Sequence, residues 1–201
     1  MCQDLPISPA TTPSASPRRT RRRKTDREQI AAAALAVGFP DLTVEAVAAH
    51  LGVTHSTLYH HVENRDALLG LAVDRAVAAH PWPAPTGAWQ TDLAAVSQSM
   101  WALLVAHPGL ARASVGATDP GPSAGGRVEQ LVRRLVDVGF TVDDAILAVD
   151  TVIDLPVDVA IRAPTHGHDV VADGPAHQWF ERKLDLVLAG IEVRLAPRGA
   201  R

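Results

Sequence analysis

The chain has 201 residues, a formal net charge of −3 and one cysteine, Cys2; it therefore has room for one large or two small domains and for no internal disulfide framework, in keeping with a reducing cytoplasm. Aromatic residues make up only 4% of it, while alanine, valine and leucine are abundant, which favours helices over sheets. The sequence has neither an apolar run long enough to span a membrane nor the apolar segment of a signal peptide, so we expect a cytoplasmic protein without a membrane partner.

The N-terminal segment is predicted to be a disordered tail followed by a basic arm. Residues 1–17 are rich in Pro, Ser and Thr and have no periodicity. Residues 18–27 contain seven basic residues and one acid, whereas residues 28–80 have a net charge of −4. Affinity for DNA depends on neutralising phosphates, so we expect three residues of the arm to contact DNA: Arg22, Arg23 and Lys24. A solvated tail without a function is the alternative.

Two helices with apolar faces are predicted after the arm. The first runs from about Thr25 to Val37 and ends at Gly38. The second follows Thr43, a good N-cap, and its apolar residues recur at positions i, i+3, i+4 and i+7: Val44, Val47, Ala48 and Leu51. Gly52 then favours a tight turn, because glycine adopts positive φ at little cost.

The third predicted helix, residues 55–62, is mostly polar. Only Leu58 and Val62 suit a core, and the other positions carry His, Ser, Thr and Tyr. A helix-turn-helix that presents this helix to the major groove of DNA explains the polarity; a packed three-helix core with an incidental polar face is the alternative. A fourth helix is predicted after Asn64, and the proline-rich segment 80–85 ends it.

The remainder of the chain is predicted to be a larger helical region. Helices are expected over residues 88–107, 110–115, 127–138, 142–162 and 176–195, with loops at 118–126 and 164–175. Pro156 is expected to kink or break the fourth of these helices. That helix is apolar nearly all round, and a buried homodimer interface would account for the surplus of apolar residues. A thick monomer core is the alternative.

Residues 42–74 resemble the TetR family of repressors, most closely the branch around the tetracycline repressor. The matching residues are Leu51-Gly52-Val53, Thr57-Leu58-Tyr59, His61-Val62, Asn64-Arg65 and Ala67-Leu68-Leu69. A fainter likeness extends to about residue 195, through Trp89-Gln90, Leu103-Leu104 to His107, Gly139-Phe140 and Asp144-Ala145. The resemblance implies an all-α protein: a tail and basic arm (1–24), a helix-turn-helix DNA-binding domain (25–80) and a ligand-binding and dimerisation domain (88–201).

The resemblance also implies the function. It predicts a homodimeric repressor that binds a palindromic double-stranded DNA operator and is released by a small-molecule inducer; an activator, or a ligand-independent DNA-binding protein of the same fold, stays open. The family's DNA contacts correspond to Thr43, Val44, Glu45, Thr54, His55, Ser56, Thr57, Tyr59, His61 and Arg65. We expect the residues from His55 to Thr57 to reach base edges, and Tyr59, His61 and Arg65 to hold phosphates.

The ligand pocket is expected among the helices that follow residue 65. Four positions match the family's pocket: His80, Val96, Met100 and Leu131. We add three neighbouring candidates: Trp101, Leu104 and Asp154. Met100 and Trp101 suit a core equally well, and Asp150, Asp154 and Asp158 could instead pair with Arg133, Arg134 or Arg162. Because this set is mainly apolar, a hydrophobic or aromatic inducer is expected.

No cofactor or metal is expected. The segment that holds a metal-ligating histidine in the tetracycline-repressor branch here reads ASVGATDP, without a histidine, which argues against tetracycline and its magnesium. The cluster His166, His168 and Asp169 is interpreted as a solvated loop. A small helical enzyme that uses these residues and the aspartates of residues 142–162 is the rival hypothesis, but it explains neither the polar third helix nor the basic arm. Catalysis is therefore not expected.

Overall fold

The computed structural model describes residues 26–117, 119 and 121–195, and all regular structure in these ranges is helical. The elements, in chain order, are α1 (Arg27–Val37), α2 (Val44–Leu51), α3 (His55–Tyr59), α4 (Arg65–Ala79), α5 (Trp89–Ala106), α6 (Leu110–Gly116), α7 (Pro122–Asp137), α8 (Val142–Arg162), the 3₁₀ helix η1 (Ala163–His166) and α9 (Pro175–Arg194). The predicted all-α fold is confirmed. None of these helices is long and apolar enough to cross a membrane.

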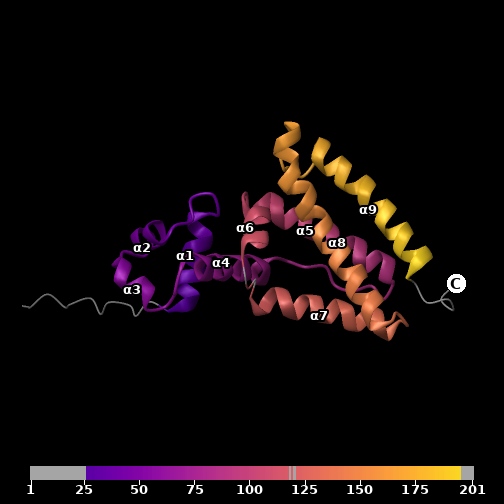
Figure 1. Cartoon of the computed structure of the whole chain (residues 1–201), viewed down its shortest axis with the longest axis horizontal. Helices are drawn as coiled ribbons and strands as arrows, with labels where there is room; N and C mark the ends of the chain where they lie inside the picture. Colours follow the sequence, from indigo (N-terminus) through magenta and orange to yellow (C-terminus); the bar gives the residue numbers. More distant parts are fainter. Residues whose placement is uncertain (1–25, 118, 120, 196–201) are drawn as a thin grey trace, which may run out of the picture.

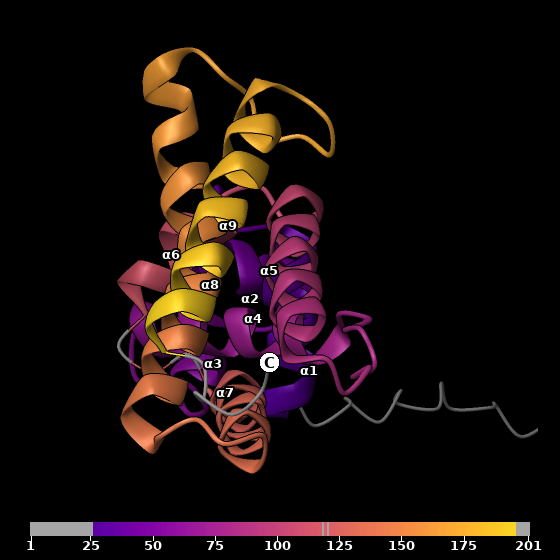
Figure 2. The same cartoon turned by 90° about the vertical axis from the view of Figure 1, so that its right-hand side faces the viewer.

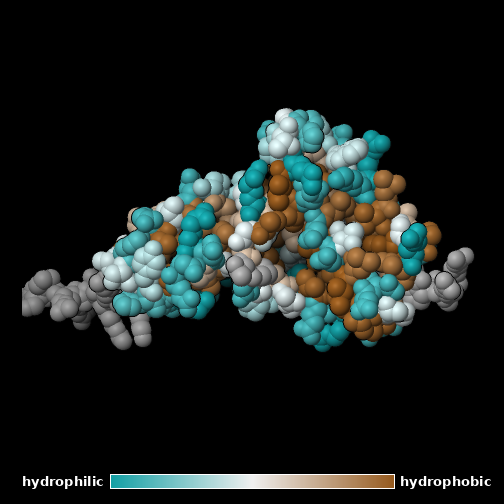
Figure 3. All heavy atoms as spheres, viewed as in Figure 1, coloured by the Kyte–Doolittle hydropathy of each residue, from teal (hydrophilic) through white to brown (hydrophobic). Residues whose placement is uncertain are grey.

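The helices form a small N-terminal unit and a larger C-terminal one (Figure 1). α1 packs on α2 and α4, and α2 packs on α3, at one end of the molecule. At the other end, α8 is central and packs against α5, α6, α7 and α9. Figure 2 shows α8 and α9 side by side on the outer face of this unit. In the space-filling view, the N-terminal unit is mainly hydrophilic, whereas apolar residues gather over the C-terminal unit (Figure 3).

Helix α4 joins the two units because it is apolar on more than one side. Leu68 and Ala72 are buried on one side of it, and the neighbouring Leu69 and Val73 are buried as well. The additional burial arises because α4 contacts α1 in the N-terminal unit and both α6 and α7 in the C-terminal unit. The chain at Asp119 passes close to Gly70 of α4, where an added Cβ atom would stand 2.6 Å from the carbonyl oxygen of Asp119.

Local sequence signals explain where most helices begin. The side chains of Thr43, Thr54, Asn64 and Thr141 each accept a hydrogen bond from a backbone amide of the following helix, as expected of N-cap residues. Asp26 does the same for Gln29 at 2.8 Å, so α1 begins at Arg27. Gly52 adopts the left-handed conformation, with φ of 64°, between α2 and α3.

Two predicted boundaries were wrong. α3 ends at Tyr59, and residues 60–61 form a turn before the buried Val62. α7 begins at Pro122, inside the segment predicted to be a loop, because proline is favoured in the first helical turn. Asp74 of α4 also accepts a hydrogen bond from the Ser123 amide at 2.7 Å, and so satisfies the start of α7 from a distant part of the chain.

Helix α8 continues through Pro156, so the predicted break does not occur. Proline has no amide hydrogen, and the carbonyl of Val152, four residues earlier, therefore has no helical partner. The hydroxyl of Ser97, which is completely buried in α5, donates to that carbonyl at 2.7 Å. The Ser97 hydroxyl thus supplies the hydrogen bond that Pro156 removes.

This exchange gives a prediction for stability. Ser97→Ala is expected to lower the free energy of unfolding by about 1–3 kcal/mol, because a buried carbonyl is left unpaired. In a Pro156→Ala background, the restored backbone amide can bond Val152 itself, so the same serine substitution is expected to cost far less. Urea unfolding of the four proteins of this double-mutant cycle measures the difference. Equal costs of Ser97→Ala in both backgrounds would contradict the explanation.

Candidate nucleic-acid interface and ligand cavity

The polar side of α3 faces solvent. Leu58 and Val62 are fully buried, as predicted, while His55, Ser56 and Tyr59 are exposed. Tyr59 keeps 48% of its surface accessible although it is a large, largely apolar side chain. The protein therefore presents hydrogen-bonding groups at the surface of its helix-turn-helix, as a helix that enters the major groove requires.

His55 is held in place by α2 as well as by its own helix. Its Nε2 atom lies 2.9 Å from Oε1 of Glu45, and its ring packs edge-on against the ring of Tyr59, with centroids 4.9 Å apart. The pKa of the Glu45 carboxyl is lowered, first by a hydrogen bond from its own backbone amide and also by His55. Glu45 is one of the predicted DNA contacts, and in the free protein its carboxylate contacts His55.

The remaining predicted DNA contacts lie around this group. Thr43 and Thr54 cap α2 and α3, and the hydroxyl groups of Thr54 and Thr57 lie 2.8 Å apart. Arg65 is exposed at the start of α4, and His61 is half-buried. Val44, at the start of α2, is only 5% exposed, and its contact with DNA stays a prediction. The predicted contacts of the basic arm, Arg22, Arg23 and Lys24, lie outside the described residues.

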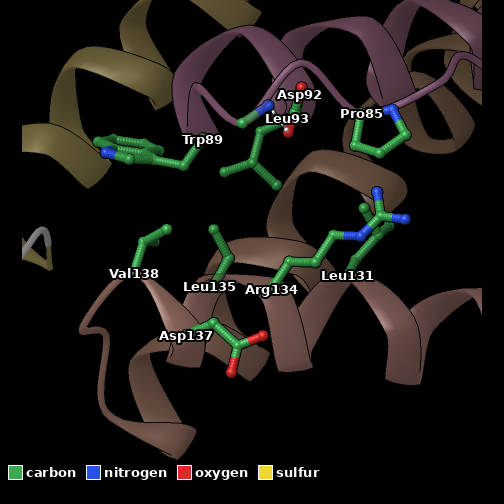
Figure 4. Close-up of a pocket in the computed structure, with 10 residues that line it drawn as sticks. Pro85, Trp89, Asp92, Leu93, Leu131, Arg134, Leu135, Asp137 and Val138 are labelled. Carbon is green, nitrogen blue, oxygen red and sulfur yellow. Dashed lines mark hydrogen bonds between the residues drawn. The ribbon is translucent and has the colours of Figure 1, made fainter.

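A cavity of about 180 Å³ lies between α5 and α7 (Figure 4). Trp89 and Leu93 of α5 face Leu135 and Val138 of α7 across it, and the Arg134 side chain rises from α7 towards α5. A smaller cavity of about 40 Å³ continues along the same two helices. The two share four lining residues: Pro85, Asp92, Leu131 and Arg134.

Only part of the predicted ligand set lines these cavities. Leu131 lines both, and Val96 lines the smaller one. The other predicted residues do not line either cavity: His80, Met100, Trp101, Leu104 and Asp154. Three of these residues lie on α5, which packs against α8 and α9.

Trp101 and Leu104 belong to the core. Trp101 is buried, stacks on Phe180 with centroids 5.2 Å apart, and donates from Nε1 to the carbonyl of Val171 at 3.0 Å. Leu104 is likewise buried, and Met100 is half-buried against the core. Met100 and Trp101 therefore pack in or against the core, which is one of the two possibilities that the sequence left open.

Two polar members of the predicted set have other surroundings. His80 Nε2 lies 2.8 Å from the Ser99 hydroxyl, and partial burial lowers the pKa of its imidazole. Asp154 is exposed on α8, but partial desolvation of its carboxyl, followed by the charge of Asp150, raises its pKa. Asp158, in contrast, pairs with Arg162 at 2.6 Å, which agrees with the pairing interpretation for that residue.

The His-rich loop lies at the far end of α8 and α9. His166 and His168 are exposed and line a separate cavity of about 510 Å³ with Arg162, Trp179 and Lys183. Among the described residues, no group of three or more His, Cys, Asp and Glu side chains is placed to hold a metal ion. Two cationic residues in the lining of this cavity, Arg162 and Lys183, both contact Asp158, at 2.6 Å and 3.7 Å.

Most residues that line the α5–α7 cavities were not predicted from the sequence, and among them are two arginines, Arg127 and Arg134. Arg127 was expected at the very start of a helix, and Arg134 only as a partner for the α8 aspartates. Their spacing of seven residues, with Leu131 between them, puts all three on one side of α7. That spacing was the available signal, but the side that faces α5 depends on tertiary packing.

Comparison with known proteins identifies the family. Residues 29–72 match the family described as bacterial regulatory proteins, tetR family, and residues 81–155 match the tetracyclin repressor-like C-terminal domain. Over 148 residues, the chain is 30% identical to the class D tetracycline repressor of Escherichia coli, a match that covers 70% of this chain and 67% of that protein. The chain belongs to the TetR family. The resemblance predicted from residues 42–74 is therefore confirmed.

Other TetR-family proteins show how far the similarity extends. The chain is 31% identical over 118 residues to the class E tetracycline repressor of Escherichia coli, covering 57% of this chain but only 56% of that repressor. A crystal structure of a TetR variant from Acinetobacter baumannii AYE in complex with minocycline superposes with a TM-score of 0.72 at 27% identity, covering 87% of this chain and all of that one. A TetR-family protein with a helix-turn-helix is a DNA-binding transcriptional regulator.

Proposed function

We propose that the protein is a homodimeric repressor that binds a palindromic DNA operator and is released by a small-molecule ligand, and that it has no catalytic activity of its own. The observation that carries this proposal is the exposed polar side of α3, with Leu58 and Val62 anchoring the helix from behind. The tetracycline repressors that the chain resembles are repressors by name, which supports the same direction of regulation.

The DNA contacts proposed on this basis divide into two groups. His55, Ser56 and Thr57 at the start of α3 would reach base edges. Tyr59, His61 and Arg65 would hold phosphates, together with the free amides at the start of α4. Arg22, Arg23 and Lys24 of the basic arm would supply much of the affinity that does not depend on sequence, because residues 28–80 alone carry a net charge of −4.

The exposed apolar residues of α8 and α9 support the dimer. Three large apolar side chains on each helix are exposed: Val142, Ile146 and Leu147 on α8, and Trp179, Leu186 and Val193 on α9. A soluble monomer seldom leaves so many on adjacent helices uncovered. The same surface on a second copy would cover them in an isologous interface, which also matches the two-fold symmetry of a palindromic site.

Ligand-induced release requires a connection between the α5–α7 cavity and the DNA-binding unit, and α4 offers one. Asp74 of α4 bonds the first turn of α7, and the chain at Asp119 lies against Gly70 without room for a methyl group. A ligand that displaces α7 would therefore also move α4 and the helices that pack on it. Because linkage is reciprocal, the ligand and the operator would each weaken binding of the other.

An electrophoretic mobility shift with the full-length chain tests the proposal. The probe is the DNA upstream of the protein's own gene, and the competitor is the same DNA with its sequence shuffled. We expect a complex that excess shuffled DNA does not displace, and a footprint of two half-sites centred one helical turn, or a multiple of it, apart. Equal affinity for both DNAs would refute sequence-specific regulation of this gene.

A further inference from the structure

The α5–α7 cavities contain two guanidinium groups that have no carboxylate partner among the described residues. Arg134 lines both cavities and Arg127 lines the smaller one, yet neither takes part in an ion pair. Arg133, between them in sequence, lies on the solvent side of α7 and pairs with Glu129 at 3.3 Å. The unpaired state of Arg127 and Arg134 thus distinguishes the side of α7 that faces the cavities.

Arg127 is in an unfavourable position for a cation without an anion. Its Nε atom is buried and has no hydrogen-bond partner in the described part of the chain. Its guanidinium lies 4.6 Å from the centroid of the Trp82 ring, which compensates only part of the lost hydration. Burial first, and then the charge of Arg134, lowers the pKa of Arg127. A partly desolvated cation that lines a cavity is a candidate for binding an anion.

Neither acid in the lining of the cavities forms an ion pair with these arginines in the described part of the chain. Burial opposes the shift, but hydrogen bonds from Thr86 and Gly87 and, to a smaller extent, the charge of Arg134 lower the pKa of the Asp92 carboxyl. The Asp92 carboxylate accepts hydrogen bonds from the amide and the hydroxyl of Thr86, both at 2.7 Å, and from the Gly87 amide at 3.3 Å. The hydrogen bonds of the Asp92 carboxylate therefore stabilise the turn before α5. The side chain of Asp137 points away from the cavity in Figure 4.

The rest of the larger cavity is apolar and contains a flat aromatic wall. Trp89 forms one end, and leucine and valine side chains from both helices form the sides (Figure 4). Guanidinium groups bind carboxylates and related oxyanions through paired, charge-assisted hydrogen bonds. A cavity of this composition would bind an aromatic body along the apolar walls and an anionic group at the arginines.

We propose that the ligand of this regulator is a small aromatic carboxylate, or an oxyanion of similar shape, whose negative group is bound by Arg134 and Arg127. The cavity of about 180 Å³ limits the body to one or two rings. The binding of an anion does not depend on the proposed function. Only the role of that anion as the inducer that releases DNA rests on it. It adds a negative group to the expected hydrophobic or aromatic inducer, because Arg127 and Arg134 bring positive charge to the cavities.

The test compares charged and neutral probes of the same shape on the full-length chain. Benzoate and 2-naphthoate are titrated by calorimetry beside benzamide and 2-naphthamide. We expect at least one carboxylate to bind about tenfold or more tightly than its amide. Arg134→Gln and Arg127→Gln are expected to remove that preference and to leave binding of the amide unchanged. Arg133→Gln is the matched control, because it removes a neighbouring arginine that faces solvent, and it is expected to bind like the unmodified chain.

Several results would overturn the inference. These are equal binding of acid and amide, binding of neither acid at millimolar concentration, or the same loss in the Arg133→Gln control. The melting temperature without a probe provides a second criterion. Arg134→Met is expected to keep or raise it, since an unpaired cation is replaced by an apolar group, and a clear fall would show that Arg134 is structural.

The operator assay separates this inference from the proposed function. A bound carboxylate is expected to weaken the operator complex, and Arg134→Gln to remove that effect. If the chain binds its operator but a bound carboxylate leaves the complex intact, the anion is not the inducer. If the chain binds no specific DNA while the preference for the acid stands, the proposed function fails and the anion site survives.

Discussion

Replacing both Tyr59 and Arg65 with alanine is expected to weaken operator binding about 100-fold or more, and to weaken binding of shuffled DNA by a similar factor. Both side chains are exposed at the helix-turn-helix, where a phenol and a guanidinium can donate to phosphate oxygens. A hydrogen bond to a charged group contributes about 1.5–3 kcal/mol, so two lost contacts give this magnitude. The loss is expected to be uniform because phosphates carry no sequence information.

The contrasting variants are His55→Ala and Glu45→Gln, which are expected to change the preferred bases. A carboxylate oxygen can only accept, so Nε2 of His55 carries the hydrogen of the 2.9 Å contact with Glu45. In the neutral ring, Nδ1 is then an acceptor, which suits the exocyclic amino group of adenine or cytosine. A glutamine at position 45 can also donate, so it no longer imposes that tautomer.

Binding of each protein to operators that are varied at every base of one half-site measures the distinction. We expect the Tyr59 and Arg65 double variant to lower the affinity for all operators by the same factor. The His55 and Glu45 variants are expected to change the order of affinities, with a change of about 1–3 kcal/mol in binding free energy at the base that His55 contacts. If all variants weaken every operator by the same factor, the division between phosphate and base contacts is wrong.

The contrast between what the sequence predicted and what it missed follows from the range of the interactions. Thr43 and Asn64 could be identified as caps because each bonds an amide three residues away. The start of α7 was predicted too late, because proline at its first position is only a weak local signal and the residue that accepts from an amide of its first turn, Asp74, lies on another helix. The continuity of α8 through Pro156 likewise depends on Ser97, 55 residues away in sequence. Local chemistry is readable from a single segment, whereas a hydrogen bond between helices requires their packing.

The same reasoning applies to the candidate sites. The polar side of α3 could be predicted because Leu58 and Val62 mark the buried side by themselves. The ligand cavity could not, because α7 has polar residues on two sides and only its contact with α5 separates Arg134 from Arg133. Resemblance to the tetracycline-repressor branch led to Val96 and Leu131, but it carried no information about arginines that belong to this chain.

Replacing Leu147 and Leu186 with glutamate is expected to convert the protein to a folded monomer and to reduce operator affinity about 100- to 10,000-fold. Leu147 on α8 is 53% exposed and Leu186 on α9 is 75% exposed in the single chain, so neither substitution disturbs the core. In the proposed dimer, both would bury a charge without a partner, which is costly. Operator affinity is expected to fall when the dimer is lost, because two linked DNA-binding units bind two half-sites about 100- to 10,000-fold more tightly than one unit binds one half-site.

The control is Val115→Glu, which introduces the same charge at a side chain that is 71% exposed on α6 and is not one of the exposed apolar residues of α8 and α9. Sedimentation equilibrium measures the oligomeric state, and thermal unfolding followed by circular dichroism shows whether the variants are folded. We expect the Val115 variant to remain a dimer with full operator affinity, because exposed apolar residues outside the proposed interface do not contribute to association. A double variant that stays dimeric would place the interface elsewhere. A folded monomer with undiminished operator affinity would show that one helix-turn-helix is sufficient, and the surplus of apolar residues on α8 and α9 would then need a different partner.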